Sequence, residues 1–199
     1  MRKQRLARIR RKTTETDIAI SINLDGKGKS DIKSPLGFLN HMLALFAKHG
    51  VFDFKLSAKG DTQVDIHHTN EDIGISLGLC FKEALGQKIA IRRFGFASVP
   101  MDGSLVEVSL DLSGRPYFKF IKGKIEDNED KKEYSLNYLK QFLQAFVNNS
   151  GITLHVEVIY GDDLHHVFEA VFKALGRALR EACQIDVRLK GVPSTKGRL

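Results

Sequence analysis

The sequence has only two cysteines among its 199 residues, and Cys80 and Cys183 are too far apart to form a CxxC pair. This pattern argues against a disulfide framework or a zinc knuckle and fits a reducing cytoplasm. No apolar run approaches the ~20 residues that a membrane-spanning helix needs. The first residues, Met1 to Leu6, also lack the apolar core of a secretion signal. We therefore expect a cytoplasmic protein that has no contact with membranes.

The net positive charge of the chain equals that of its N-terminal segment. The net charge is +7, from 31 lysines and arginines and 24 aspartates and glutamates. Residues 1–12 contain seven basic side chains and no acidic one, so the rest of the chain is neutral. A neutral body argues against a nucleic-acid partner, because such proteins concentrate positive charge on a binding face. We expect residues 1–12 to form a solvated basic terminus.

Periodicity predicts a mixture of strands and helices. Apolar residues alternate with polar ones, as in half-buried strands, over residues 18–24, 52–56, 106–112 and 152–160. Helical patterns cover residues 38–48, 67–85, 138–148 and 167–182, and two of these end near a glycine, Gly50 or Gly151. We expect the charged segment from Lys122 to Glu133 to be a mobile surface loop.

The two long helical patterns align at an offset of 98 residues. The offset superimposes His67 on His165, His68 on His166, Glu71 on Glu169, Gly78 on Gly176 and Glu83 on Glu181. Matching residues and a matching order of elements indicate an internal duplication. The predicted fold is α+β, with a first half-repeat over residues 1–92 and a second over residues 93–199.

Each copy carries a His-His-x-x-Glu motif. Positions i and i+4 share one helix face, so His67 with Glu71, and His165 with Glu169, can each chelate a metal. The neighbouring histidines, His68 and His166, are turned by ~100°. A reciprocal scheme follows, in which His166 joins the first pair and His68 joins the second. Ligation by nitrogen and oxygen suits manganese, iron, cobalt or zinc.

The candidates for anion binding have weaker support from sequence spacing than the repeated histidine motif has. Lys173 lies one helical turn beyond Glu169 on the predicted metal face, whereas Arg93 and Arg115 have no informative spacing. The tail Pro193-Ser194-Thr195-Lys196-Gly197 offers hydroxyls, backbone amides and an ammonium group, which together suit a phosphate.

Seven segments together resemble the imidazoleglycerol-phosphate dehydratase family. They are GFLNHML at 37–43, DIHHTNED at 65–72, RFG at 93–95, VPMD at 99–102, SGRPY at 113–117, HHVFEA at 165–170 and PSTKG at 193–197. The resemblance implies two similar halves, each a four-stranded sheet with helices on one face, like domain 2 of ribosomal protein S5. It also implies a lyase of histidine biosynthesis that removes water from D-erythro-imidazole-glycerol phosphate to give imidazole acetol phosphate. Two manganese ions per active site and a large symmetric homo-oligomer of about 24 copies, with sites between subunits, are further implications.

The resemblance also assigns residues to roles. One metal takes His41, His68, His165 and Glu169, and the other takes His67, Glu71 and His166. The implied catalytic residues are Glu15, His67, Glu71, His165 and Glu169. The implied substrate-binding residues, which include the tail, are Glu15, His41, His49, Arg93, Arg115, Lys173, Ser194, Thr195 and Lys196.

One departure from the family pattern concerns the second metal. Gln141 stands where the family often has a histidine, 24 residues before the second His-His pair. An amide oxygen is a weaker ligand, which predicts looser binding or a water in that place.

Mechanistically, we expect metal coordination to ease loss of the imidazole proton, so that the resulting imidazolate expels the side-chain hydroxyl while Glu15 shuttles a proton. Two other classes stay open, a dinuclear metallohydrolase and a non-catalytic metal-binding shell protein.

Overall fold

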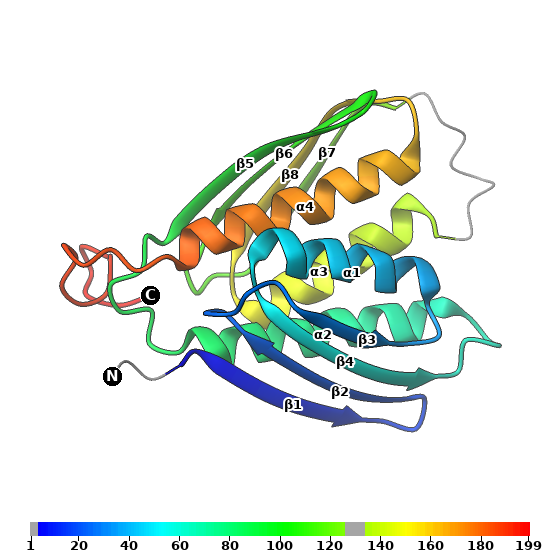
Figure 1. Cartoon of the computed structure of the whole chain (residues 1–199), viewed down its shortest axis with the longest axis horizontal. Helices are drawn as coiled ribbons and strands as arrows, with labels where there is room; N and C mark the ends of the chain where they lie inside the picture. The colour runs from blue at the N-terminus through cyan, green and yellow to red at the C-terminus, as the bar shows by residue number, and fades with distance from the viewer. Residues whose placement is uncertain (1–3, 126–133) are drawn as a thin grey trace.

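In the computed structural model, which describes residues 4–125 and 134–199, two four-stranded sheets enclose four helices (Figure 1). The first half contains β1 Leu6–Lys12, β2 Thr16–Asn23, β3 Ser30–Lys33, α1 Gly37–Gly50, β4 Asp53–Gly60 and α2 Ile66–Leu85. The second half contains β5 Phe94–Met101, β6 Ser104–Asp111, β7 Tyr117–Ile125, α3 Leu136–Ser150, β8 Thr153–Gly161 and α4 Leu164–Cys183. The order β-β-β-α-β-α occurs twice, which confirms the predicted duplicated α+β fold.

The two sheets share one topology. Their strand orders are β1-β2-β4-β3 and β5-β6-β8-β7, and in each sheet the last pair is parallel while the others are antiparallel. Each parallel pair is connected through a helix, as parallel pairing requires. One face of each sheet is apolar and buried, and the alternating side chains of the other face point to solvent.

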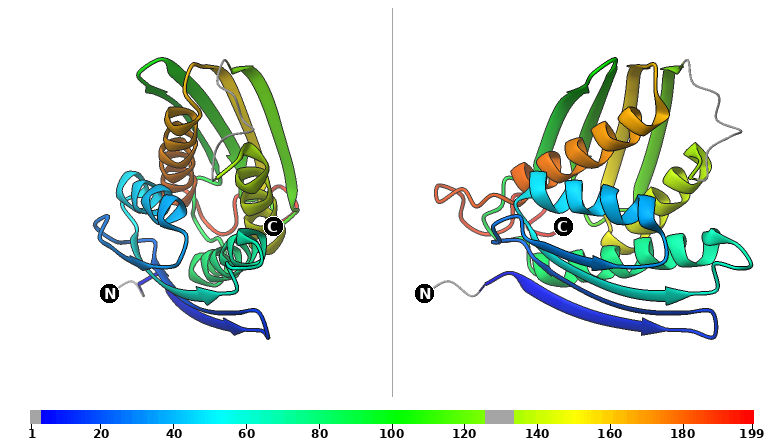
Figure 2. Two further views of the ribbon diagram at one scale, coloured as in Figure 1. Left: turned by 90° about the vertical axis from the view of Figure 1, so that its right-hand side faces the viewer. Right: turned by 45° about the vertical axis from the view of Figure 1, so that its right-hand side comes forward.

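The helices form a layer between the sheets (Figure 2). α2 lies on β1 and β2, and α4 lies on β5 and β6, while α1 packs on α4 and α2 packs on α3 across the boundary between the halves. All four helices run in the same direction in Figure 1. Their N-terminal ends therefore gather at one end of the molecule, which places the first turns of α2 and α4 on the same side.

Two glycines allow this close packing between the halves. A Cβ atom added to Gly176 on α4 would lie 2.6 Å from the carbonyl oxygen of Phe46 on α1. A Cβ atom added to Gly78 on α2 would lie 2.6 Å from the carbonyl oxygen of Phe146 on α3. These glycines are equivalent under the 98-residue offset, so the duplication preserves the contact as well as the motif.

Two local expectations were wrong. Residues 6–12 form the edge strand β1 and are not a free terminus, because Ala7 and Ile9 face the core while Arg10 pairs with Asp17 and Arg11 with Asp72. Only Ala7 and Ile9 show the alternation of apolar and polar residues here, and the arginines around them made the strand pattern hard to recognise in the sequence. Residues 122–125, expected to begin a loop, complete β7, and residues 126–133 lie outside the described residues. No helix within the described ranges is long and apolar enough to cross a membrane.

Replacing Gly176 by alanine should destabilise the fold by about 1–3 kcal/mol, since the added methyl group forces α4 away from α1. The direction of this change in stability is informative, because a glycine-to-alanine substitution inside a helix ordinarily stabilises the fold by about 1 kcal/mol. Urea unfolding of the metal-free chain measures the effect. Gly37→Ala, where a Cβ atom meets nothing within 4 Å, is the matched control. Equal stability of the two variants would contradict the tight packing at Gly176.

Candidate metal centre

Both His-His pairs begin a helix in the same way. The Asp65 carboxylate accepts a hydrogen bond from the backbone N–H of His67, and the Asp163 carboxylate accepts one from His165. An aspartate at the N-cap satisfies a free backbone donor and fixes where the helix starts. The two caps are again 98 residues apart, so each histidine pair is held on the first turn of its helix.

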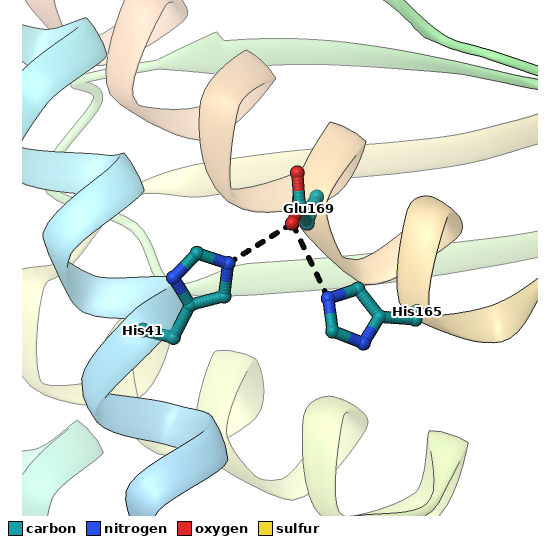
Figure 3. A group of neighbouring side chains, drawn as sticks. All are labelled: His41, His165 and Glu169. Carbon is teal, nitrogen blue, oxygen red and sulfur yellow. Dashed lines mark hydrogen bonds and ion pairs between the residues drawn. The ribbon is translucent and has the colours of Figure 1, made fainter.

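Three potential metal ligands converge between α1 and α4 (Figure 3). His41 Nε2 lies 2.9 Å, and His165 Nε2 3.3 Å, from the same oxygen, Oε1 of Glu169. Their ligand atoms all lie within 4.8 Å of one another, and they form the one such group of three or more within residues 4–125 and 134–199. Two imidazole nitrogens and a carboxylate oxygen on one side fit a manganese, iron, cobalt or zinc ion. Three side chains predicted to bind metal therefore lie together in the fold.

Glu169 is the electrostatic centre of this group. The residue as a whole is 9% exposed. Burial alone would raise the pKa of its carboxyl group, but hydrogen bonds from Lys173 and His41 outweigh that effect and lower the pKa to about 2. Lys173 Nζ lies 2.7 Å from Oε2, so it occupies the oxygen that the histidines leave free. The carboxylate is held charged and oriented toward the histidines.

The motif on α2 has a different partner. His67 Nδ1 lies 2.8 Å from Gln141 Oε1 of α3, and an amide oxygen only accepts, so the imidazole donates from Nδ1. Its Nε2 then carries the lone pair and lies 3.4 Å from Glu71 Oε2. Within one chain Gln141 thus orients His67, in the way that outer-shell partners orient metal-binding histidines.

The second histidines of the two pairs point elsewhere. His68 Nδ1 donates to Asp61 Oδ2 at 3.0 Å, and this bond raises the pKa of His68. His166 Nε2 lies 3.6 Å from Asp102 Oδ2. A single chain therefore does not gather His166 with His67 and Glu71, or His68 with His165. Neither Asp61 nor Asp102 has a counterpart in the other half at the 98-residue offset, so the repeat gave no role to either.

Glu15 lies on the β1–β2 hairpin, at the same end of the molecule. Its Oε2 is 3.8 Å from His68 Nδ1. The next residue, Thr16, donates from Oγ1 to buried Asp72, which also pairs with Arg11. Asp72 directly follows Glu71 on α2, so one carboxylate ties the hairpin to the helix. Its position gave no signal, since the second repeat has Ala170 there.

Apart from Lys173, which pairs with Glu169, the anion-binding candidates gather at the opposite end of α4. The Arg93 guanidinium binds both oxygens of Asp111 and donates to the carbonyl of Pro193 at 2.9 Å, while its backbone N–H donates to Ala182. From Ala182 to His165 the helix spans about 25 Å. The tail, with Ser194, Thr195 and Lys196, begins at this distant end. Arg115 is exposed there, beside Gly114, which the C-terminal residue contacts.

His49 lies between the two ends, one step before the last residue of α1. Partial burial lowers the pKa of its imidazole, and the nearby cations Lys173 and Arg177 lower it further. A neutral imidazole there can donate and accept hydrogen bonds. The set predicted to bind substrate is therefore spread along the whole length of the helices in one chain.

A duplicated α+β fold that concentrates imidazole and carboxylate groups at its helix N-termini defines a protein with metal-ligand chemistry. Residues 34–179 match the family model described as imidazoleglycerol-phosphate dehydratase. The chain belongs to the imidazoleglycerol-phosphate dehydratase family, and it is an enzyme, a lyase that eliminates water.

Individual relatives cover the chain from end to end. It is 52% identical over 198 residues to the imidazoleglycerol-phosphate dehydratase of Caldanaerobacter subterraneus, covering 98% of this chain and 100% of that one. A relative from Clostridium botulinum strain Langeland is 54% identical, with 99% and 100% covered.

Solved structures agree with the fold. The Staphylococcus aureus enzyme matches with a TM-score of 0.80 at 35% identity, over 91% of this chain and 99% of that one. The Pyrococcus furiosus enzyme in complex with (S)-C348 matches with a TM-score of 0.82 at 39% identity, over 96% and 100%.

Removing the charge of Lys173 tests the electrostatics of the cluster. In metal-free Lys173→Met, the pKa of Glu169 should rise from about 2 toward its ordinary value of 4.5, because burial is then opposed by His41 alone. Carboxyl ¹³C NMR titration measures it, with the exposed Lys82→Met as control. In the parent, the charged contact should stabilise the fold above about pH 4.5 and be lost as pH falls toward 2. An unshifted Glu169 titration in the variant would contradict this account.

Proposed function

We propose that this enzyme removes water from D-erythro-imidazole-glycerol phosphate to form imidazole acetol phosphate, in cytoplasmic histidine biosynthesis. The observation that carries the proposal is the convergence of His41, His165 and Glu169 in a chain of this family. The substrate supplies an imidazole, which binds the same metals as histidine does. Its phosphate matches the cationic groups around the tail.

Two manganese ions per active site complete the proposal. His41, His165 and Glu169 would hold one ion, and His67 and Glu71 the other, with Gln141 behind His67. His68 and His166 would come from a neighbouring copy, because in one chain they face Asp61 and Asp102. Bound manganese supplies a Lewis acid that eases loss of the proton from the substrate's imidazole nitrogen.

Side chains of this protein carry out the proton transfers and hold the reacting groups in position. Glu15, exposed and close to His68, takes a proton from the substrate carbon and gives it to the departing hydroxyl, which leaves as water. The enol that remains moves its hydroxyl proton to carbon to give the ketone, and the ring nitrogen regains its proton when the product is released. Asp72 and Thr16 hold the hairpin so that Glu15 stays beside His68. Lys173 and His41 keep Glu169 charged.

Phosphate binding would involve Arg93, Arg115, Ser194, Thr195 and Lys196, with Lys173 and His49 toward the middle. Because the tail lies about 25 Å from His165, one copy cannot place a small substrate against both groups. We therefore propose that copies assemble into a large, closed, symmetric homo-oligomer of about 24 copies, in which the tail of one copy meets the metal centre of another.

Turnover of imidazole-glycerol phosphate by metal-stripped protein, titrated with Mn²⁺, tests the proposal. Activity should be absent without metal and should saturate near two ions per chain, and sedimentation should show larger particles once metal is added. Full activity after chelation would contradict the metal role. Hydrolysis of a phosphoester would indicate a metallohydrolase, and metal-driven assembly without any turnover would indicate a shell protein.

Glu15→Gln should lower kcat by about 10²–10⁴-fold with little change in KM, because it removes the proton carrier and keeps the shape. Steady-state kinetics in saturating Mn²⁺ measures the effect. The matched control is Glu83→Gln, an exposed glutamate on α2 remote from the first turn. Unchanged kcat in Glu15→Gln would remove Glu15 from the mechanism.

A further inference from the structure

The two His-His-x-x-Glu motifs differ in the residue directly before the glutamate. The first motif has Asn70 there, and the second has Phe168 at the 98-residue offset. Both residues are buried, with 0% and 1% of their surface exposed. A buried amide destabilises a fold unless hydrogen bonds satisfy it, whereas a phenyl ring needs none. Asn70 is therefore a polar group that the repeat itself does not require.

Tyr134 contacts this position in both motifs. Its hydroxyl donates to Asn70 Oδ1 at 2.7 Å, and its ring meets that of Phe168 with the ring centres 6.0 Å apart. The residue is buried, and burial raises the pKa of the hydroxyl, which stays a protonated donor. One side chain thus lies against the residue before the glutamate in each motif, with a hydrogen bond to the first and a ring contact to the second.

From Tyr134, packed rings lead to His165 on α4. The centre of the Phe38 ring on α1 lies 5.2 Å from that of Tyr134 and 5.2 Å from that of His165. The Phe38 and His165 rings are perpendicular, at 90°. Phe38 also meets Phe168 edge-on at 5.8 Å. Because close-packed rings leave little free space, the orientation of the His165 imidazole depends on where Tyr134 holds Phe38.

Hydrogen bonds lead from Tyr134 the other way, to His67 on α2. Asn70 Nδ2 donates to the carbonyl oxygen of Tyr138 at 2.9 Å. The Tyr138 hydroxyl donates at 2.9 Å to Asp65 Oδ1, the oxygen that also accepts from the backbone N–H of His67. The first turn of α2, and with it His67, is therefore connected to Tyr134 through Asn70.

We infer that Tyr134 is a positioning residue that couples the two motifs, so that a displacement of α2 at Asn70 also reorients His165 on α4. The consequence for metal binding rests on the proposed function of these motifs. The ring contact with Phe168 has no directional bond to the first motif and does not supply this link by itself. The hydrogen bond to Asn70 fixes how the tyrosine lies, and the packed rings transmit that position to α4.

NMR spectra (¹H–¹³C) of the histidine rings, recorded on the full chain in EDTA at one fixed pH, test the coupling without metal. Asn70→Leu, which keeps the branched shape on α2, should shift the His165 signals of α4. In a Tyr134→Phe background the same substitution should change His165 far less, because the hydrogen bond is already lost. Equal shifts of His165 in both backgrounds, or no shift in either, would overturn the inference.

Manganese affinity, measured by electron paramagnetic resonance of free Mn²⁺, gives a second readout. Tyr134→Phe and Asn70→Leu should each weaken Mn²⁺ binding about tenfold, as loss of a residue that orients a metal ligand does. The double variant replaces both members of the bonded pair by apolar groups and should recover most of the affinity. A double variant as weak as either single variant would contradict an action through this hydrogen bond.

Two control variants separate positioning from stability. Phe81→Leu, a buried substitution in the C-terminal half of α2, should lower the free energy of unfolding without changing Mn²⁺ affinity. Tyr160→Phe removes an exposed hydroxyl and should behave as the parent does. An affinity loss in Phe81→Leu equal to that in Tyr134→Phe would overturn the inference. A parent that binds no Mn²⁺ would contradict the proposed metal centre, and the spectra in EDTA would then decide the coupling by themselves.

Discussion

The close approach of α1 and α4 at Gly176 is the contact on which the metal centre depends. His41 lies on α1, whereas His165 and Glu169 lie on α4, and no loop connects these residues directly. Their atoms meet because the two helix backbones pack without an intervening side chain. The equivalent contact at Gly78 sets α2 against α3 and so brings His67 to Gln141. The same close contact between a helix glycine and a neighbouring helix backbone occurs in both halves, and it positions both halves of the site.

The parallel direction of the four helices has a second consequence. It collects the positive ends of the helix dipoles on one side of the molecule. Carboxylates are stabilised in that field, and the region contains Glu71, Glu169 and the capping aspartates Asp65 and Asp163. The acidic side chains in turn compensate the charge of a bound cation. Scaffold and ligands therefore support each other electrostatically.

Duplication has been followed by divergence wherever the two halves meet different surroundings. His41 approaches Glu169 directly, whereas Gln141 contacts the ring of His67 and not Glu71. Lys173 pairs with Glu169, and no described lysine pairs with Glu71 in the same way. The outer sheet faces differ still more, one hollow and basic, the other aromatic and acidic. Inner faces are constrained by a shared core, whereas the outer faces are exposed and can differ between the halves.

Sequence alone was sufficient for the duplication, the four helices, two strands in each half, and the closeness of His67 to Glu71 and of His165 to Glu169. Periodicity and a 98-residue offset can both be read directly from the order of residues along the chain. The family resemblance implied that His41 joins the second pair, and the tertiary structure gave the physical reason, the packing of α1 on α4. Only the tertiary structure showed that Asp61, Asp72 and Asp102 lie against the remaining groups, and that β1 is a strand. Only it placed the tail about 25 Å from His165, which separates residues that the family resemblance groups together. These contacts join residues distant in the chain, and their geometry is set by helix packing, which leaves no periodic trace in the sequence.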